Sequence, residues 1–480
     1  MTFRDFPGAL GAEMRYQSPR SMSKQPSTAR GVYPAMSHPP ADPAVAVVAA
    51  RFAGLEPPDP ARSSFLEIGC ATGHHLLPLA MRWPQARFTG IDISTDAVAM
   101  AVDLATEAGL NRRVDFLACA LEEFTPTGQR YDFIIAHGFF SWVPDPVKRR
   151  LLAFCAEHLS PHGLAVVSFN VEAGWRGRME LVRMARALQE TDGGLDEMAA
   201  LQRLKSSVNE PVPLAVINDM LAKGQAILPF DDFAPVNDPW RLDSFVAAAG
   251  SAGLRWIGES RVADNRPPGW SADDEAGAAA IRSTMTPVEF HQWIDERSGR
   301  TFRSALLCRA DVPASARMKA SDVFSFALRP ATPEPPPGSA TALRIHQALM
   351  TDWPSAPQAE ALISRLRDIP PQEIAREICE MIIGGRLWAR SEPLDIPTVP
   401  PYCPALDPLR MACAKRRLPV VDAWHRPCVF PDNQYPVLEC IDGSLTPGEL
   451  ENRAAKITPK LDFKRWLAHI HERGILLHCE

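Results

Sequence analysis

The sequence predicts an α/β fold in which helices cover both faces of a central parallel sheet. Short apolar runs typical of buried strands alternate with helical patterns in the first part of the chain. Five of these runs lie at 64–69, 86–92, 113–119, 131–137 and 164–170. Parallel strands need helical crossovers of this kind between them. Two further strand-like runs, 253–260 and 302–310, add the last strands if they belong to the same sheet.

The chain divides into a larger α/β domain and a smaller helix-rich C-terminal region. We expect residues 1–30, rich in Ser, Arg, Met and Pro, to be a disordered leader. The α/β domain is predicted over 31–312, and the strand-free stretch 176–235 is a helical insertion in it. The proline-rich sequence ATPEPPPGSA indicates a linker, which we place at 313–340. Residues 341–480 alternate helices with short strands in two small units, a winged-helix-like pattern.

The bulk composition argues against several classes of partner. The 480 residues are 46% hydrophobic and carry a formal net charge of −6, which disfavours a nucleic-acid surface. No run of apolar residues is long enough for a membrane span. The first residues lack the apolar core of a secretory signal, and the ten cysteines form no CxxC pair. These features predict a cytoplasmic protein with free thiols.

Histidine and cysteine residues near the C-terminus raise the question of a bound metal. His469, His471, His478 and Cys479 lie close together in the sequence. Their spacing matches no standard zinc pattern, and we therefore predict no metal site.

The loop after the first predicted strand has the spacing of a nucleotide-binding turn. The sequence FLEIGCATGHHLLP, residues 65–78, places Glu67, Gly69, Ala71 and Gly73 at every second position. In open α/β sheets, ligands bind at the carboxyl ends of strands, where glycines let the backbone approach them. A dinucleotide fingerprint requires G-x-G-x-x-G, whose third glycine is missing here. The pattern instead resembles motif I of class I methyltransferases that use S-adenosylmethionine (SAM).

An acidic residue, Asp92, ends the second predicted strand. A carboxylate at this point can accept hydrogen bonds from both ribose hydroxyls of a nucleotide. An NAD enzyme uses the same device, so Asp92 does not distinguish SAM from NAD, and an acidic turn residue is the alternative. If SAM binds, Ile93 flanks the adenine, while Ala120 and Leu121 line its edge.

The stretch after the fourth predicted strand carries the most family-specific sequence. YDFIIAHGFFSWVPDPV, residues 131–147, resembles the signature (F/Y)D-Y-I-I-A-H-G-x-(Y/F)-S-W-V-P-x-x-V. That signature belongs to bacterial methyltransferases with a methyltransferase regulatory domain, among them rickettsial-type protein-lysine methyltransferases that act on outer-membrane proteins. GCATGHHLLPLA, LSPHGLAVVSFNVEAGW and FRSALLCRADV also resemble segments of this family, so the resemblance covers about residues 33–312.

The resemblance implies a Rossmann-like class I methyltransferase fold with a seven-stranded sheet, helical inserts and a C-terminal regulatory region. It implies SAM as the cofactor, S-adenosylhomocysteine (SAH) as the product, an envelope or outer-membrane protein as the partner, and a homodimer. One departure concerns the family's GGN sequence, which becomes Gly73-His74-His75 here. We expect His75 to replace the amide as a donor to the methionyl end of the cofactor. A member that binds SAM without turnover is the alternative.

Residues that follow the fourth and fifth strands form the predicted acceptor side of the site. We interpret His137 first as a donor that orients the cofactor and second as a proton acceptor, with a core histidine as the alternative. Phe140 and Trp142 are predicted to wall the pocket, although plain packing would also explain Trp142. Asn170 and Trp175 are predicted to face the same rim, although a helix cap would explain Asn170 equally well.

Transfer of a methyl group to a lysine side chain of a protein is the leading functional hypothesis. A lysine, with a pKa near 10.4, must lose a proton before it attacks, and a desolvating aromatic mouth favours that loss. The same rings attract the cationic stem with about 0.5–2 kcal/mol. A small-molecule N- or O-methyltransferase and a non-catalytic SAM-binding or interaction protein are the alternatives. The predicted cofactor side contains Tyr33, Glu67, Gly69, Cys70, Gly73, His75, Asp92, Ile93, Ala120, Leu121 and His137.

Overall fold

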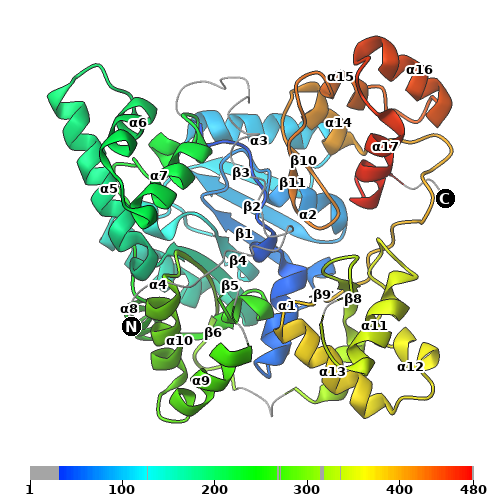
Figure 1. Cartoon of the computed structure of the whole chain (residues 1–480), viewed down its shortest axis with the longest axis horizontal. Helices are drawn as coiled ribbons and strands as arrows, with labels where there is room; N and C mark the ends of the chain where they lie inside the picture. Colours follow the sequence, from blue (N-terminus) through cyan, green and yellow to red (C-terminus); the bar gives the residue numbers. More distant parts are fainter. Residues whose placement is uncertain are drawn as a thin grey trace.

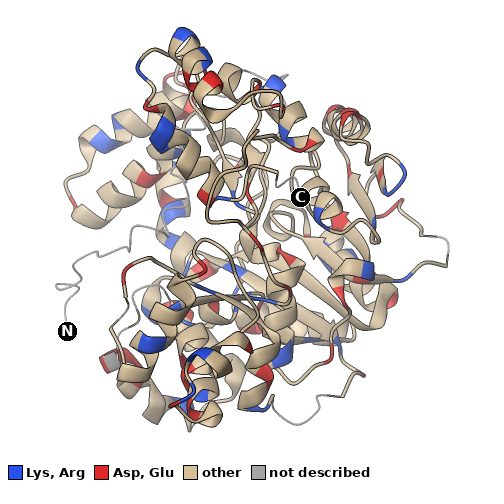
Figure 2. Ribbon diagram, turned by 90° about the vertical axis from the view of Figure 1, so that its right-hand side faces the viewer, with Lys and Arg blue, Asp and Glu red and all other residues tan. Residues whose placement is uncertain are grey.

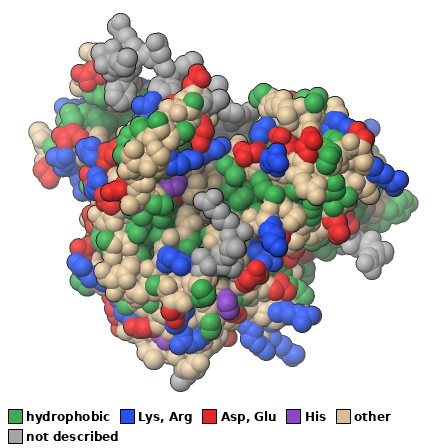
Figure 3. Space-filling model, turned by 90° about the horizontal axis from the view of Figure 1, so that it is seen from below, with side chains coloured by type: hydrophobic (Ala, Val, Ile, Leu, Met, Phe, Trp, Pro, Cys, Tyr) green, Lys and Arg blue, Asp and Glu red, His purple; other side chains and the backbone are tan. Residues whose placement is uncertain are grey.

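The computed structural model describes residues 32–126, 128–267, 270, 272–313, 318–335 and 337–477. The predicted leader, residues 1–30, lies outside these residues. A central sheet is flanked by helices, and the C-terminal part of the chain packs along one side of the domain (Figure 1). Within the described ranges, no helix combines the length and apolar character that a membrane span needs. Acidic and basic residues are interspersed along the ribbon (Figure 2) and over the face seen from below (Figure 3).

The seven predicted strands form one sheet, which confirms the predicted fold class. They are β1 Ser64–Ile68, β2 Arg87–Asp92, β3 Val114–Ala118, β4 Tyr131–Ala136, β5 Leu159–Asn170, β6 Leu254–Glu259 and β7 Phe302–Arg309. Their order is β3-β2-β1-β4-β5-β7-β6. The first five strands pair parallel, as predicted, while β7 pairs antiparallel with both β5 and β6. The order reverses between β1 and β4, where an open sheet forms its ligand-binding crevice.

Strand residues alternate between two hydrophobic layers, since successive side chains point to opposite faces. In one layer the rings of Phe88 and Phe133 stack 4.7 and 5.0 Å from the ring of Phe65. The other layer includes Leu66 and Ile134. Burial on both faces explains the near-continuous apolar strands of the sequence. The covering helices are α1 Pro43–Phe52, α2 Leu76–Arg82, α3 Thr95–Glu107, α4 Asp145–His158 and α8 Leu242–Ser251.

The predicted insertion, residues 176–235, is helical. Its apolar side chains, among them Leu181, Leu201, Ile217 and Met220, form a small core of their own beside the sheet (Figure 1). A second helical insertion separates β6 from β7. It returns the chain at the end of the sheet from which β7 runs antiparallel to β6. The helices of the two insertions are α5 Glu172–Thr191, α6 Glu197–Ser207, α7 Pro211–Lys223, η5 Leu228–Phe230, η6 Val262–Asn265, α9 Ala272–Arg282 and α10 Pro287–Ser298.

The structure corrects the predicted linker at 313–340. η7 Ala320–Ser325 packs against α13 Pro371–Ile383. β8 Ala327–Pro330 pairs antiparallel with β9 Leu387–Arg390. Both segments bury apolar side chains. The proline-rich stretch that follows them in the sequence led us to include them in the linker.

The C-terminal region is helix-rich, as predicted. β10 Val420–Val421 and β11 Pro427–Cys428 form a short hairpin in it. Near the end of the described residues, Leu477 forms an isolated antiparallel bridge with Ala405. The remaining helices of this region are α11 Ala340–Met350, α12 Ala361–Arg365, α14 Pro408–Lys415, α15 Tyr435–Leu438, α16 Pro447–Ile457 and α17 Phe463–Glu472.

Polar contacts and a continuous hydrophobic layer dock the C-terminal region on α1, α2 and α3. Nε1 of Trp83 donates to Oε2 of Glu392 at 2.8 Å, and Arg416 pairs with Glu107. Nη2 of Arg82 donates to the carbonyl oxygen of Ala423, between β10 and β11, at 3.2 Å. The hairpin is therefore fixed directly against α2, the helix that follows β1.

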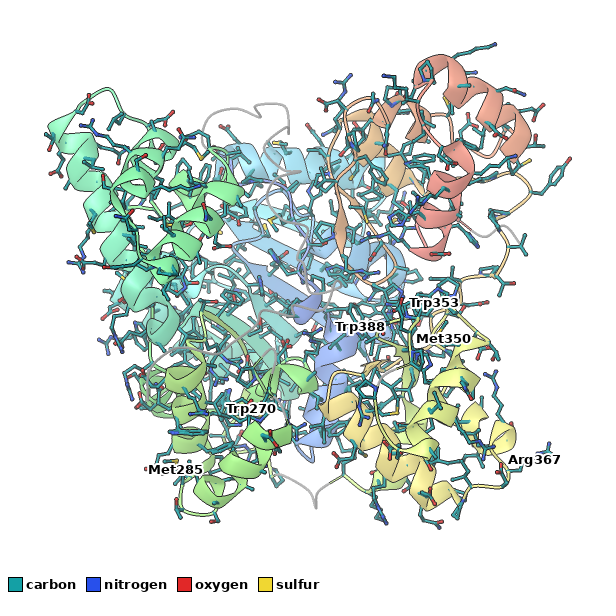
Figure 4. All side chains as sticks on the ribbon, in the orientation of Figure 1. Trp270, Met285, Met350, Trp353, Arg367 and Trp388 are labelled. Carbon is teal, nitrogen blue, oxygen red and sulfur yellow. The ribbon has the colours of Figure 1, made fainter. Side chains whose placement is uncertain are left out.

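Three tryptophan rings around Arg329 hold the segment at the C-terminal hairpin. The guanidinium carbon of Arg329 lies 4.6, 5.3 and 4.2 Å from the ring centroids of Trp353, Trp388 and Trp424. Trp353 and Trp388 lie close to each other beside β8 and β9 (Figure 4). Each such cation–π contact contributes about 0.5–2 kcal/mol. The residue next to His425 is thus anchored within the C-terminal region.

A buried ion cluster joins β6, β7 and α10. Arg303 on β7 is 1% exposed, and its Nε and Nη2 donate to Asp295 at 2.9 and 2.8 Å. Its Nη1 donates to Glu259, whose other oxygen accepts from the Ser304 amide at 2.8 Å. Each charge in the cluster therefore has a partner, which makes the removal of one member costly.

We expect Arg303→Leu to lower the free energy of unfolding by about 3–5 kcal/mol, because two buried carboxylates lose their cation. The matched control is Arg309→Leu on the same strand, which removes a surface pair with Asp311 and should cost less than about 1 kcal/mol. Denaturant-induced unfolding measures both variants. Equally small losses would contradict the role given to Arg303.

Candidate active site

The turn between β1 and α2 uses backbone conformations that favour glycine. Gly69, Ala71 and Gly73 have φ angles of 78°, 44° and 73°. A Cβ atom on Gly69 would lie 2.9 Å from Cδ2 of Phe139, and one on Gly73 would lie 2.7 Å from Cζ of Phe116. The two glycines therefore leave room for these rings. Ala71 adopts the left-handed region without being glycine, at a cost of about 1–2 kcal/mol.

Asp92 ties this turn to the end of β2. Its Oδ2 accepts from the Ala71 amide and its Oδ1 from the Ser94 amide, both at 2.8 Å. The Gly69 amide donates to the carbonyl oxygen of Ile91 at 2.8 Å. The carboxylate is held in a fixed orientation, and each of its oxygens keeps a lone pair for a further donor such as a ribose hydroxyl.

Glu67 is a second carboxylate, buried on β1 just before the turn. It is 3% exposed, and its Oε2 has no hydrogen-bond partner among the described residues. Burial, and to a smaller extent the charge of Asp92, raise the pKa of Glu67 well above its usual range. A buried acid in this state is costly unless a ligand supplies a donor. A ligand group that donates a hydrogen bond at this point would offset that cost.

Three histidine rings gather beside the turn. The ring of His38 stacks on that of His137 with 4.0 Å between centroids and lies 5.8 Å from the ring of His75. Nδ1 of His38, Nε2 of His75 and Nδ1 of His137 are buried and lack a partner among the described residues. Burial lowers the pKa of His38 to about 4 and the pKa values of His75 and His137 well below their usual range. The rings are therefore neutral at pH 7, and each offers a nitrogen atom to a polar ligand.

This histidine group is not arranged as a metal centre. Across the described ranges, no set of three or more His, Cys, Asp and Glu residues is placed to hold a metal ion. The unsatisfied nitrogens point instead to hydrogen bonding with an organic ligand.

Phe140 lies in the core and not in the pocket wall where we predicted it. Its side chain is fully buried, and its ring meets those of Trp240 and Phe245 edge-on at 5.0 and 5.3 Å. The Lys148 ammonium lies 5.6 Å from the same ring. The turn η4 (Phe140–Trp142) directs neighbouring aromatic side chains to different sides, and residue type alone does not show which ring faces inward.

Trp142 and Trp175 meet at the rim of the site. Their rings pack edge to face with 6.2 Å between centroids. Trp175 is 5% exposed, and its Nε1 donates to the carbonyl oxygen of Thr301 at 2.9 Å. Trp142 stays partly exposed. The fixed Trp175 therefore supports Trp142, which is the member of the pair that keeps more exposed surface.

Asn170 ends β5 and joins it to the segment after the insertion. Its Nδ2 donates to Oδ1 of Asn237 at 3.1 Å, and its amide donates to Oγ of Ser141 at 2.8 Å. The N-cap of α5 is Val171, so Asn170 does not serve as that helix cap. Asn170 thus positions the rim and its own side chain is engaged within the protein.

The two acids beside the rim are neutralised by internal cations. Asp232 is buried and pairs with Arg178 and with Lys223. Asp231 pairs with the same Lys223. Arg178 and Lys223 also lie 5.3 and 5.8 Å from the ring of Trp175. Asp231 and Asp232 therefore stabilise the packing of the insertion against Trp175. Their negative charges are neutralised within the protein.

Other residues predicted to bind the cofactor surround the turn at different depths. Ile93 is 78% exposed beside Asp92, where it can cover a planar ligand. Leu121 and Cys70 are each 4% exposed, and Ala120 lies between these extremes. Leu121 and Cys70 therefore support the crevice from beneath.

Contributions from distant parts of the chain complete the site. The ring of Tyr33 is 36% exposed and meets Phe230 of the insertion edge-on at 6.0 Å. His425 of the C-terminal region was missed by sequence reasoning, yet its Nε2 lies 2.8 Å from Nδ1 of His75. No motif around His425 marks it as a site residue, because the contact spans 350 positions of the chain.

Comparison with known sequences defines the class of the first domain. Residues 65–163 match the family described as a methyltransferase domain. An uncharacterized protein of Rickettsia prowazekii is 26% identical over 288 residues, which cover 57% of this chain and 51% of that protein. A trans-aconitate 2-methyltransferase of Streptomyces avermitilis is 32% identical over 155 residues, which cover 32% of this chain and 54% of that enzyme. The chain thus spans about half the length of the curated relatives it matches.

A solved structure shares the fold over nearly the whole chain. PKMT2 from Rickettsia typhi, in complex with AdoHcy, superposes with a TM-score of 0.78 at 18% sequence identity. The superposition covers 92% of this chain and 99% of that one. Residues 65–163 thus match a methyltransferase domain, and the chain shares the fold of PKMT2 over nearly its whole length.

We expect Asp92→Ala to weaken the binding of SAH by about 100-fold, because two charge-assisted hydrogen bonds to the ribose are lost. Isothermal titration calorimetry measures the change. Asp103→Ala, on the exposed side of α3, is the matched control and should keep the wild-type affinity. Unchanged affinity of Asp92→Ala, in a folded protein that binds SAH, would rule out the ribose role.

The stability of the protein should fall steeply as the pH is lowered from 7 to 5. Burial lowers the pKa of His74 to about 4 and the pKa of His425 to about 3. It also lowers the pKa of His75 well below its usual range. Below pH 6.5 these histidines bind protons in the unfolded chain but stay neutral in the folded protein. Their contribution to the free energy of unfolding is therefore complete above pH 6.5 and is lost as the pH falls. At pH 5 each such ring lowers the free energy of unfolding by about 2 kcal/mol relative to pH 7. The raised pKa of Glu67 acts in the opposite direction, but it is one group against the several buried histidines whose pKa values are lowered.

Urea unfolding at a series of pH values measures this loss. His74→Asn should flatten the profile, because one buried imidazole no longer resists protonation. A free energy of unfolding that stays constant from pH 7 to 5 would show that these rings titrate normally.

Proposed function

We propose that this protein is a SAM-dependent methyltransferase whose acceptor is a lysine side chain of another protein. The observation that carries the proposal is the pair of carboxylates at the point where the strand order reverses. Asp92 is held by two backbone amides, and Glu67 is buried without a partner among the described residues. The first suits ribose hydroxyls and the second suits the methionyl ammonium. The family match over 65–163 supports this cofactor.

The residues around the crevice fit the work that such a reaction leaves to the protein. When bound, SAM would supply an already activated methyl group, so the protein needs to orient the acceptor and exclude water. The lowered pKa of His137 makes its ring a weak base, which favours an orienting role over that of proton acceptor. Trp142 and Trp175 form an aromatic rim that desolvates a lysine stem and favours its neutral form.

A protein acceptor is supported by the sequence at 131–147, which resembles that of methyltransferases acting on outer-membrane proteins. The fold shared with PKMT2 extends over the insertion and the C-terminal region, which a compact small-molecule pocket does not need. The same resemblance supports an envelope protein as the partner and a homodimer, while the cytoplasmic location stays a prediction from the cysteine pattern.

A small-molecule methyltransferase is the second candidate. The 32% identity with a trans-aconitate 2-methyltransferase over 155 residues favours it. That similarity covers 32% of this chain and therefore bears on the cofactor domain more than on the acceptor side.

Incubation of the protein with labelled SAM and separate soluble and envelope fractions should transfer label to protein in the envelope fraction. Acid hydrolysis should then release the label as methylated lysine. Asp92→Ala is the inactive control, and it should transfer no label. Label found only in small molecules would reject the lysine proposal, and binding of SAM without any transfer would establish a non-catalytic protein.

A further inference from the structure

A histidine of the C-terminal region contacts a histidine of the cofactor turn. Nε2 of His425 lies 2.8 Å from Nδ1 of His75, and the two rings meet edge to face with 4.5 Å between centroids. His75 is 2% exposed and His425 is fully buried. The contact is therefore shielded from water, where a hydrogen bond has its greatest effect on the proton positions of both rings.

A second contact fixes the direction of this hydrogen bond. The backbone amide of His38 donates to the same Nδ1 of His75 at 3.3 Å. A backbone amide only donates, so Nδ1 of His75 acts as an acceptor, shared in a three-centre arrangement. His425 must then donate through its Nε2–H. If Nδ1 of His75 carried the proton instead, it would face the amide hydrogen of His38.

The tautomer of His75 follows from these two donors. A neutral imidazole has one protonated nitrogen, so His75 carries its proton on Nε2. Burial lowers the pKa values of both His75 and His425, which keeps both rings neutral. Nε2 of His75 is buried and has no acceptor among the described residues. An unsatisfied buried donor costs about 1–3 kcal/mol, which an acceptor group of a ligand would recover.

The turn that carries His425 is held rigidly. Oδ1 of Asp422 accepts from the amides of Trp424 and Arg426 at 2.9 and 2.8 Å. Oγ of Ser37 donates to the carbonyl oxygen of His425 at 3.0 Å. His425 itself has a φ of 60°, a left-handed conformation that the surrounding bonds must maintain. These hydrogen bonds fix the backbone around His425 and so hold its ring against His75.

We propose that His425 is a positioning residue of the cofactor site: together with the His38 amide, it holds His75 in the tautomer that presents Nε2–H to the carboxylate of the cofactor's methionyl end. This inference rests on the proposed function. The donor that the resembling family takes from an amide is thus supplied here by a histidine, whose orientation is set by the C-terminal region. Cofactor affinity then depends on the docking of that region.

The first test measures SAH binding by calorimetry in His425→Leu and His425→Gln. His425→Leu removes the donor and should weaken binding about tenfold, the value of one buried hydrogen bond. Gln retains a donor at a similar reach and should restore most of the affinity. His346→Leu is the matched control, because His346 is also buried in the C-terminal region but bonds only to the Thr332 carbonyl oxygen. It should keep the wild-type affinity.

The second test records the His75 ring by nitrogen-15 NMR of histidine-labelled protein without cofactor. The wild type should show the Nε2–H tautomer. In His425→Leu the population of that tautomer should fall, because only the longer 3.3 Å hydrogen bond from the His38 amide then favours it. This readout does not depend on activity and separates positioning from general loss of stability.

The outcomes separate the two proposals. Wild-type protein that does not bind SAH would overturn the proposed function. Wild-type binding with unchanged affinity in a folded His425→Leu, or an Nδ1–H tautomer of His75 in the wild type, would overturn the positioning role alone. Equal weakening by His346→Leu would also overturn it, because the effect would then follow from stability.

Discussion

The hydrogen bond from the Ala71 amide to Asp92 is the contact on which the rest of the site depends. It joins the turn after β1 to the end of β2 at 2.8 Å and holds Ala71 at a φ of 44°. A non-glycine residue in this region loses about 1–2 kcal/mol, while a hydrogen bond to a charged group returns about 1.5–3 kcal/mol. The strained turn is therefore stable as long as the carboxylate is present. Without it, neither the open crevice nor the position of Glu67 relative to Asp92 would be maintained.

Some buried polar groups in the described residues are fully paired, and others lack a partner. Arg303 and its carboxylates are fully paired, as is Lys148 with Asp238. Beside the turn, by contrast, Glu67 and three histidine rings leave polar atoms without partners. Native interiors rarely tolerate such atoms. Isolated cases occur elsewhere, but only here do an acid and several imidazoles converge at the reversal of strand order. Their concentration marks the place of a polar ligand.

The sequence predicts what depends on local patterns and misses what depends on distant contacts. All seven strands follow from apolar runs, and Asp92 follows from its place at a strand end. The antiparallel direction of β7 does not, because pairing direction depends on the path of the preceding helices. The burial of Phe140 in the core is not predictable either, because the sequence shows that aromatic residues are adjacent but does not show which ring faces the core. His425 is the extreme case, because its role exists only through a contact with a residue in another part of the fold.

That contact gives the C-terminal region a physical connection to the cofactor crevice. Arg82 on α2 donates both to Asp42 before α1 and to the Ala423 carbonyl beside His425. The helix that follows the cofactor turn is thus held from the N-terminal segment and from the C-terminal hairpin at once. Coupling between two sites is reciprocal: a region that sets the affinity for a ligand is itself stabilised when the ligand binds. A partner that displaces the hairpin would therefore lower cofactor affinity, and a bound cofactor would resist that displacement by the same free energy.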